Sequence, residues 1–431
     1  MVYGSLVPLD FRPLPWSDAW QRLLQAPMLR LGIESRADWV ANGVLYLPVG
    51  FLSTAVLMGR RAGFAQKSLA AVLGVAFGWA LALGVEFAQT AFPPRSVSRN
   101  DLLAEAIGTS LGMLVALSGT DRLRSLLAGF RDGGWPLLSR LAPFYALAFP
   151  AMALFPFDLL VSSAEWHSKL HGPQVGLWLA ESSRGWGPFR LLVKLLVETA
   201  AVMPLGALWW HWRQTAAPSS RRHRGPSLTA ALLTGAALGL AIEAAQLAMA
   251  SGQSQGLSVL TRALGFAAGA AAWQHHAAIR LETLRAALRR FTGPVLALNL
   301  GLLLLFNQVG QGPWLSMGEI DYRLRSELRY VPFYYHYFTT EMHAVTSLVA
   351  VSLSYAPLGV LGWAWHVRPG VVATMALLLS ALMELSKLPS RPLHPDPTNL
   401  LIAAVAAWAA HRLVQRLSAE GGSRGVAALR P

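Results

Sequence analysis

The sequence contains no cysteine, and charged residues make up only 13% of its 431 residues. Without cysteine, the protein can have neither disulfides, nor thiol nucleophiles, nor cysteine-ligated zinc. A soluble domain carries about 25% charged residues, so the composition excludes a soluble enzyme of this length. The hydrophobic content of 54% excludes a disordered or fibrous chain. Because burying charge in lipid is costly, the scarcity of charge indicates a membrane protein.

Long apolar runs follow one another along the whole chain. A helix needs about 20 apolar residues to cross the hydrocarbon core of a bilayer. Runs of about this length fall at 38–58, 68–91, 101–118, 141–161, 190–211, 227–250, 257–275, 293–310, 344–366, 369–386 and 397–415. The sequence therefore predicts an all-α fold, a polytopic transmembrane helix bundle of about eleven spans.

Basic residues give the chain a formal net charge of +14. They gather in alternate gaps between the apolar runs, as the positive-inside rule requires of cytoplasmic loops. No basic stripe is long enough to follow a phosphate backbone, so we expect no nucleic-acid partner. The same alternation predicts a cytoplasmic C-terminus and an N-terminus on the outer side.

Two short motifs recur three times along the chain, which is the signature of internal repeats. The first combines proline and glycine, as in Pro48-Val-Gly50, Pro204-Leu-Gly206 and Pro357-Leu-Gly359. The second begins with glutamate, as in Glu86-Phe-Ala-Gln89, Glu243-Ala-Ala-Gln246 and the weaker Glu384-Leu-Ser-Lys387. We predict three pseudo-repeats of about four helices each, at 1–140, 141–290 and 291–431. The first repeat is the best preserved, although its first span is missing, and the third ends in a basic cytoplasmic tail.

The first repeat resembles the VanZ-like family of bacterial membrane proteins over residues 8–117. The matching residues are Asp38, Asn42, Pro48, Gly50, Glu86, Gln89, Arg95, Asp101, Gly108 and Gly112. The chain departs from the family pattern at Glu105, where the family has asparagine. In the second repeat, Gly252, Ser258 and Arg262 replace the loop arginine, the aspartate and the asparagine.

The resemblance implies a multipass protein of the bacterial cytoplasmic (inner) membrane with a role in the cell envelope. The family takes its name from a teicoplanin-resistance determinant, so a glycopeptide-resistance type of role is expected. Membrane lipids are the expected partners, together with a lipid-linked envelope precursor or an amphipathic antibiotic. The resemblance brings no biochemical mechanism with it.

A group of polar residues is predicted near the outer surface in the first repeat. Glu86 lies about 9 Å inside the membrane, at 1.5 Å per helical residue, and acids at that depth are usually functional or paired. Gln89 shares its helix face, Arg95 follows in the loop, and Asp101 and Glu105 begin the next helix. The family pattern adds Asp38 and Asn42. Two interpretations stay open: a pocket for a headgroup or precursor, and a network that fixes the loop.

Two further features follow from the same motifs. A Glu86–Arg95 ion pair is expected to hold the loop, whereas Glu243 lacks a loop arginine and should matter less. Pro48, Pro204 and Pro357 are predicted to kink their helices, because proline removes one backbone hydrogen bond. Such a kink could open a cavity or serve only the packing of a bent helix.

Three classes of function remain open. The favoured one is a non-enzymatic protein that binds or moves an amphipathic envelope molecule, because no nucleophile stands beside the carboxylates. The alternatives are a membrane enzyme acting on a lipid-linked cell-wall or polysaccharide precursor, and a membrane scaffold. We expect neither a cofactor nor a metal site, and dimerisation through the glycine motifs is not favoured.

Overall fold

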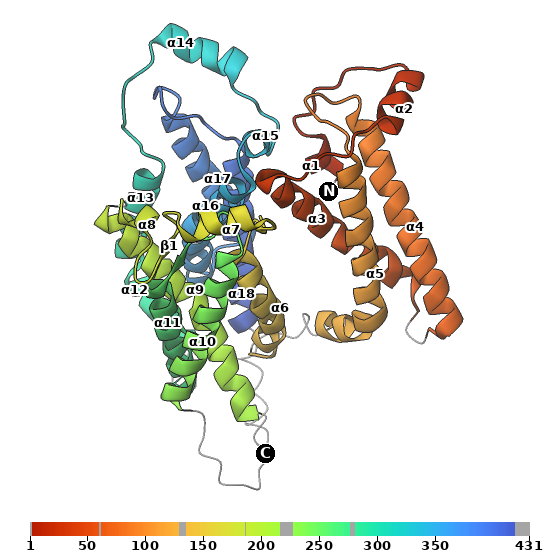
Figure 1. Ribbon diagram of the computed structural model, residues 1–431. Helices are drawn as coiled ribbons and strands as arrows, with labels where there is room; N and C mark the ends of the chain where they lie inside the picture. The colour runs from red at the N-terminus through yellow and green to blue at the C-terminus, as the bar shows by residue number, and fades with distance from the viewer. Residues whose placement is uncertain are drawn as a thin grey trace. The chain divides into compact units, whose positions relative to one another are not determined.

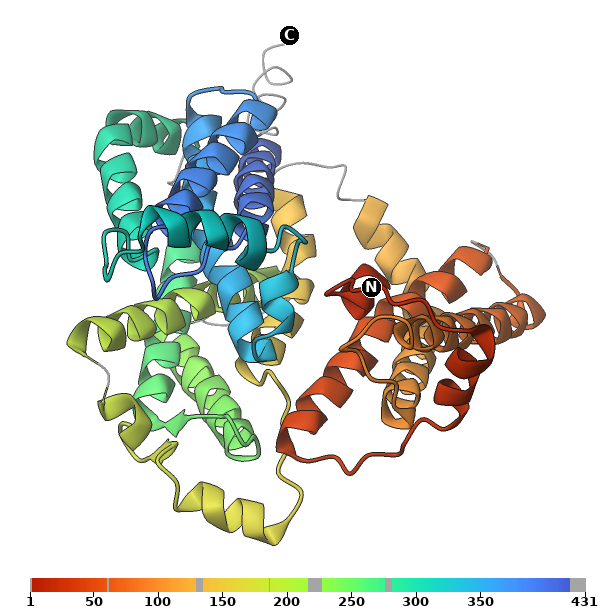
Figure 2. The same cartoon turned by 90° about the horizontal axis from the view of Figure 1, so that it is seen from above.

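The computed structural model describes residues 2–59, 62–128, 135–185, 187–215, 227–275 and 281–418. Helices make up most of it, and a parallel pair of two-residue strands joins β1 (Val175–Gly176) to β2 (Ser254–Gln255) (Figure 1, Figure 2). The predicted all-α polytopic helix bundle is confirmed. The chain divides into two compact units, residues 1–28, 49–113 and 281–431, and residues 29–48 and 114–280.

The first unit contains a helical hairpin near the N-terminus and the C-terminal helices. Its elements are α1 (Val2–Leu6), α2 (Trp16–Leu24), α4 (Phe64–Gln89), α12 (Leu281–Arg290), α13 (Thr292–Phe306), α14 (Met317–Tyr322), the π-helix η3 (Arg323–Glu327), α15 (Tyr334–Tyr337), α16 (Glu341–Ala364), α17 (Pro369–Ser386) and α18 (Thr398–Ser418). The later part of α3 (Ile33–Leu57) and the earlier part of α5 (Arg99–Ala128) also belong to it. Helices α16, α17 and α18 pack side by side (Figure 1).

The second unit is built around three packed helices. Its elements are α6 (Trp135–Ala153), α7 (Ser163–Leu170), β1, α8 (Glu181–Arg184), α9 (Pro188–Thr215), α10 (Leu228–Leu247), β2 and α11 (Gly256–Gln274), with the remaining parts of α3 and α5. Helix α11 packs against both α9 and α10 (Figure 1).

Eight helices of the described part of the chain are long and apolar enough to cross a membrane. They are α3, α4, α5, α9, α10, α16, α17 and α18. Helix α13 has 15 residues, about 23 Å at 1.5 Å per residue, which is short for a core of about 30 Å. It reaches the required length together with α12, from which it is bent by 69°. The structure thus has eight such helices, or up to nine with the bent pair, where the sequence predicted about eleven.

The two other predicted spans coincide with α6 and α11, which are 19 residues each. Helix α6 contains Pro143 and Pro150, and α11 contains the buried Arg262. Neither helix is among the eight. An arginine lowers the mean hydropathy of a helix even where the side chain is buried and paired.

Three glycines allow pairs of helices to approach closely. A Cβ atom on Gly50 would clash with the carbonyl oxygen of Thr109, joining α3 to α5. The equivalent clashes would be between Gly206 and Phe266, for α9 and α11, and between Gly359 and Ala407, for α16 and α18. Each glycine follows, two positions later, a proline that lies within its helix, namely Pro48, Pro204 and Pro357. Small residues at such crossings are what close packing in lipid requires.

Buried cations from preceding segments bind two of the loops that follow long helices. Lys169 is 4% exposed, and its Nζ donates to the carbonyl oxygens of Ala250 and Gly252. Desolvation lowers the pKa of Lys169, and the charge of Asp158 opposes this shift. The loop after α10 is therefore held by charge-assisted hydrogen bonds to its backbone.

The loop after α17 is held in the same way. The guanidinium of Arg323, 6% exposed, donates to the carbonyl oxygens of Leu388, Ser390 and Leu393 at 2.8–3.1 Å. Since these backbone groups have no partner within a helix, the arginine satisfies them away from water.

A bidentate ion pair ties α7 to α3 within the second unit. Both guanidinium nitrogens of Arg36 lie 3.0 Å from the carboxylate oxygens of Glu165. Glu165 also accepts hydrogen bonds from the amides of Val161 and Ser162, which completes a capping box at the start of α7. The Arg36 hydrogen bonds, followed by the two amides, lower the pKa of Glu165 to about 2.

We predict that Glu165→Gln lowers the thermal unfolding midpoint in detergent at pH 7. The pKa of Glu165 is depressed in the folded protein, so its stabilisation is present above pH 4.5 and is lost as the pH falls from 4.5 towards 2. The difference between wild type and variant should therefore be constant at neutral pH and shrink in acid. Asp321→Asn is the matched control, because the Asp321–Arg325 pair is exposed and should contribute little. Equal midpoints for wild type and Glu165→Gln at pH 7 would contradict this.

Candidate ligand-binding site

The candidate site lies where α4 ends and α5 begins. Helix α4 ends at Gln89, and the chain turns back into α5 at Arg99. The Ser98 hydroxyl binds both the backbone amide of Asp101 at 3.1 Å and its carboxylate at 2.6 Å. A serine in this position caps the first turn of a helix, so it fixes where α5 starts. Asp101 is half-buried and its carboxylate is held at the start of α5.

Glu86 is the most buried acid of the site, at 1% exposure. One carboxylate oxygen accepts a hydrogen bond from the amide of Ser98, and Arg95 and Asp101 are near enough to act on the carboxylate electrostatically. Its Oε2 has no hydrogen-bond partner within the described residues. A buried carboxylate oxygen in this state is costly, because it has lost its water without gaining a donor.

Gln89 and Arg95 bind the chain segment that precedes the site. Gln89 donates to the carbonyl oxygen of Ser5 at 3.1 Å. Arg95 donates from Nε to Val7 and from Nη2 to Gly4, at 2.8 and 2.7 Å, and its guanidinium lies 4.1 Å from the ring centre of Tyr337. Arg95 was expected to hold its loop through an ion pair with Glu86. Its hydrogen bonds go to the backbone of residues 4–7, and its charge acts on Glu86 electrostatically.

The other predicted residues lie on helices. Glu105 is 4% exposed and follows Asp101 by one turn of α5. Asp38 and Asn42 lie on the first half of α3, where Asp38 is exposed and Asn42 half-buried, and they belong to the second compact unit. The structure thus gathers Glu86, Asp101 and Arg95 by their electrostatic contacts. We call Glu86, Asp101 and Glu105 the acidic cluster.

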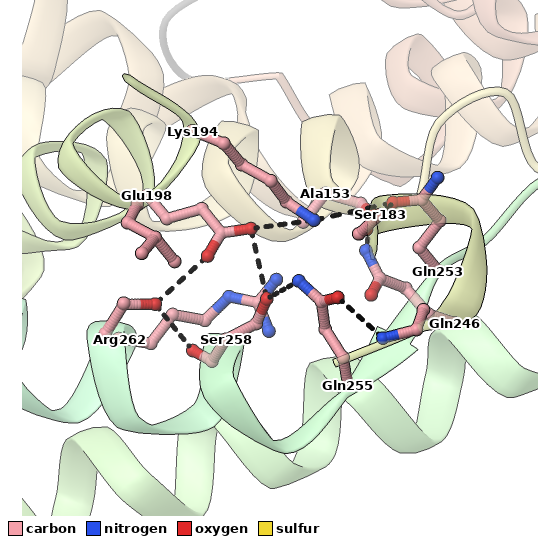
Figure 3. A network of polar contacts seen from close by, with 12 residues as sticks. Ala153, Ser183, Lys194, Glu198, Gln246, Gln253, Gln255, Ser258 and Arg262 are labelled. Atoms are coloured by element: carbon pink, nitrogen blue, oxygen red, sulfur yellow. Dashed lines mark hydrogen bonds and ion pairs between the residues drawn. The ribbon is translucent and has the colours of Figure 1, made fainter. Parts of the chain in front are cut away.

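A larger polar network surrounds the loop after α10 (Figure 3). Glu198 on α9 accepts hydrogen bonds from Ser258 at 3.1 Å and Thr261 at 3.0 Å, both on α11, and Lys194 lies 3.9 Å away. Gln246 donates to the carbonyl oxygen of Ala153 at 2.9 Å. The network joins four helices, α6, α9, α10 and α11, and the loop between α10 and α11.

Glu243 anchors this network beneath the loop. It is 6% exposed, accepts a hydrogen bond from the amide of Gln255, and forms an ion pair with Arg262, which is itself 5% exposed. The loop after α10 has no arginine, as expected, but Arg262 on α11 supplies a cation to Glu243. A charge buried in a helix bundle persists when it is paired and hydrogen-bonded.

Glu384, at the end of α17, likewise has hydrogen-bond donors and a cation. It accepts hydrogen bonds from the amide of Asp396 at 2.7 Å and from Asn399 at 2.8 Å, and Lys387 lies 2.7 Å away. In each of the three loops the glutamate thus binds a backbone amide twelve positions later, at Ser98, Gln255 or Asp396.

The three glutamates differ in their counter-charges. Glu243 and Glu384 have a cation in direct contact, from Arg262 and Lys387. Arg262 follows its glutamate by nineteen residues, and the residue at the same distance from Glu86 is Glu105 on α5. The acidic cluster therefore combines three acids, and the buried Oε2 atom of Glu86 has no hydrogen-bond partner among the described residues. It can accept hydrogen bonds from a cationic or hydroxyl-bearing group.

Sequence reasoning did not assign roles to Ser98, Lys194 or Glu198. Ser98 stands three residues before Asp101, which is the spacing of a capping residue and was available as a signal. Lys194 and Glu198 are four residues apart on one helix face, which favours an ion pair. The partners of Glu198 on α11 are about 60 residues away, and no local pattern indicates them.

We predict that Arg262→Gln destabilises the protein by about 3–5 kcal/mol, because it leaves the Glu243 carboxylate buried without its cation. The double variant Glu243→Gln with Arg262→Gln should recover most of the loss, since neither charge is then left unpaired. The measurement is the free energy of unfolding or the thermal midpoint in detergent. Arg325→Gln is the control and should stay within about 0.5 kcal/mol of wild type, as its ion pair is exposed.

Comparisons with known proteins give one result. Residues 3–120 match the family model described as VanZ/LLP1. No curated protein and no solved structure matches the chain. The matched range contains α1 to α4, the loop with Arg95 and the acidic cluster. Residues 3–120 of this multipass membrane protein are therefore a VanZ-like domain.

Proposed function

We propose that this protein of the bacterial inner membrane binds an amphipathic envelope molecule at the acidic cluster, in a glycopeptide-resistance type of role. The molecule would be a lipid-linked precursor or an amphipathic antibiotic. The observation that carries the proposal is the Oε2 atom of Glu86, which is buried and has no hydrogen-bond partner in the described part of the chain.

The comparison with the other two loops supports this proposal. Glu243 and Glu384 are also buried, and each has a side-chain cation in contact as well as a backbone amide. A purely structural carboxylate would be expected to have the same complement, because an uncompensated charge in lipid is expensive. Glu86 departs from this pattern in the domain that matches the family.

The chemistry of the acidic cluster indicates the class of ligand. A carboxylate accepts hydrogen bonds and attracts positive charge, so the ligand should present an ammonium group or hydroxyl groups. The cluster stands at the end of a membrane-crossing helix, where a headgroup would meet it while an acyl or polyprenyl chain stays in the lipid. An amino-bearing amphipathic molecule has both properties.

We further propose that the chain consists of three VanZ-like repeats, at 1–140, 141–290 and 291–431, of which the first keeps the binding site. The equivalent glycine contacts and the equivalent glutamate–amide bonds support it. A third set of contacts agrees. The carbonyl oxygens of Ala91, Ala248 and Pro389, each five positions after its glutamate, accept from the amides of Arg12, Leu160 and Leu315.

We predict that Glu86→Gln lowers the amount of bound amphipathic molecule while leaving the thermal midpoint near that of wild type. The substitution removes a buried carboxylate oxygen that has no donor among the described residues, whereas the ligand loses its ionic partner. The matched variant is Glu243→Gln, which should destabilise by about 3–5 kcal/mol, because Arg262 stays buried without its anion, and should keep the ligand. The measurements are mass spectrometry of molecules that copurify with the protein, and thermal unfolding.

Two outcomes would contradict the proposal. If Glu86→Gln lost stability as severely as Glu243→Gln, the acidic cluster would be a structural network. If wild type and Glu86→Gln carried the same molecules in the same amounts, Glu86 would not bind them. Susceptibility of cells to a lipoglycopeptide, compared between the same two variants, extends the test to the resistance role.

The proposed orientation places the loop of the acidic cluster outside and the start of α17 in the cytoplasm. The sequence has no cysteine, so single cysteines can be introduced without background. Ser96→Cys is in a loop position, and Gly370→Cys is at a site where a Cβ meets no atom within 4 Å. An impermeant thiol reagent added to intact spheroplasts should label Ser96→Cys and spare Gly370→Cys. The reverse pattern would overturn the orientation.

A further inference from the structure

A cavity of about 260 Å³ lies in the first compact unit, at the end of the α16–α18 bundle opposite to the Glu384 loop. It is lined from α12 by Arg285, from the end of α16 by Trp363, and from α18 by His411 and Gln415. Arg368, just before α17, completes it. Among the described residues, the side chains that line the cavity include cations, imidazoles and an indole, and no carboxylate.

Arg285 lines the cavity and contacts the indole of Trp363, which also lines it. Its guanidinium lies 4.4 Å from the ring centre of Trp363, which is a cation–π contact. Its Nε is buried and has no hydrogen-bond partner within the described residues. The carboxylate of Glu282 lies 3.9 Å from Arg285 and is 87% exposed, so it neutralises little of the charge. The arginine therefore lines the cavity and keeps one buried donor without a partner among the described residues.

His411 provides a second buried polar atom. The residue is 3% exposed, and its Nε2 lies 2.9 Å from the carbonyl oxygen of Val367. Since a carbonyl only accepts, Nε2 must carry the proton that is donated. The other nitrogen, Nδ1, is buried and has no hydrogen-bond partner in the described part of the chain. It can accept from a hydroxyl group, or donate to an anion when the ring is protonated.

The start of α17 adds to the positive potential. This helix has 18 residues, with Pro369 at its first position and Arg368 at its N-cap. The first amides of a helix have no acceptor within it, and they point along a dipole that favours anions. Helix termini of this kind bind phosphate groups, and here the cavity adds two arginines to the same place.

The position of α12 indicates where the ligand comes from. The helix carries Arg285, Arg289 and Arg290 and is bent by 69° from the apolar helix α13 that follows it. Leucines at 281, 284 and 288 alternate with these cations at helical spacing. A basic amphipathic helix with this bend lies along the membrane surface, at the level of the lipid headgroups. Basic pockets between helices at that level bind anionic headgroups.

We infer that this cavity binds the phosphate diester of an anionic phospholipid headgroup that also carries a hydroxyl group, as in phosphatidylglycerol. Arg285, Arg368 and the amides of α17 take the phosphate oxygens, and Nδ1 of His411 accepts from the hydroxyl. This site is separate from the acidic cluster in its residues, in charge and in ligand class. Its test therefore does not depend on the proposed function.

The test is native mass spectrometry of the delipidated full-length protein, titrated with phosphatidylglycerol or phosphatidylcholine of equal chain length. Wild type should bind phosphatidylglycerol about tenfold more tightly, as expected for one or two charge-assisted hydrogen bonds. Arg285→Gln and Arg368→Gln should each reduce this preference, and the double variant should abolish it. Arg290→Gln is the matched control, since Arg290 is on the same helix, is exposed and does not line the cavity.

A conservative variant and a competing anion complete the experiment. Arg368 is exposed, so Arg368→Gln reports on binding even if Arg285→Gln fails to fold, and Arg285→Lys should retain part of the preference. Inorganic phosphate at millimolar concentration should displace little of the lipid. Full displacement by inorganic phosphate would show a site for the free anion and overturn the lipid assignment. An equal loss in Arg290→Gln, or no preference in wild type, would overturn the site itself.

Discussion

A carboxylate at the end of a membrane helix has to receive hydrogen bonds from its own protein, because lipid offers none. In this chain the requirement is met in the same way three times. Glu86, Glu243 and Glu384 each accept the amide of the residue twelve positions later. That bond closes the loop between two antiparallel helices, and the direction of the next helix follows from it. The loops are thus folded around a buried charge.

The three buried carboxylates differ in how completely they are partnered. Around Glu243 the helices supply a cation and a network of side chains that leaves the carboxylate fully partnered. Around Glu384 a lysine one turn away does the same. Around Glu86 the equivalent helix position holds a second acid, Glu105. Buried polar networks stabilise one arrangement when complete, and are sites of ligand binding or instability when a partner is missing. In the VanZ-like domain, the Oε2 atom of Glu86 has no hydrogen-bond partner in the part of the chain that the structure describes.

The sequence predicted the helical fold well, because long apolar runs translate directly into helices in lipid. The glutamates, Gln89 and the prolines were found from their spacing. Arg262 was noticed as a replacement, yet its pairing with Glu243 was not predicted, because α10 and α11 must first pack for the two to meet. Arg95 was expected to contact Glu86, whereas its hydrogen bonds to Val7 and Gly4 depend on a segment almost 90 residues earlier. Backbone carbonyls carry no sequence signal, so arginines that bind them escape pattern analysis.

The source of the cation that holds each loop has a consequence for how such modules can be recombined. After α10 and α17, backbone carbonyls of the loops accept hydrogen bonds from Lys169 and Arg323, which belong to the preceding segments. After α4 the donor and acceptor sides are exchanged, because Arg95 is in the loop and its acceptors are in the preceding segment. Moving the Arg95 loop behind a segment of the other kind would bring a guanidinium against an existing ammonium or guanidinium. The opposite exchange would separate the carbonyl oxygens on both sides from the cations that now bind them. Each loop and the segment before it therefore form one structural unit, which can be exchanged whole but not in halves.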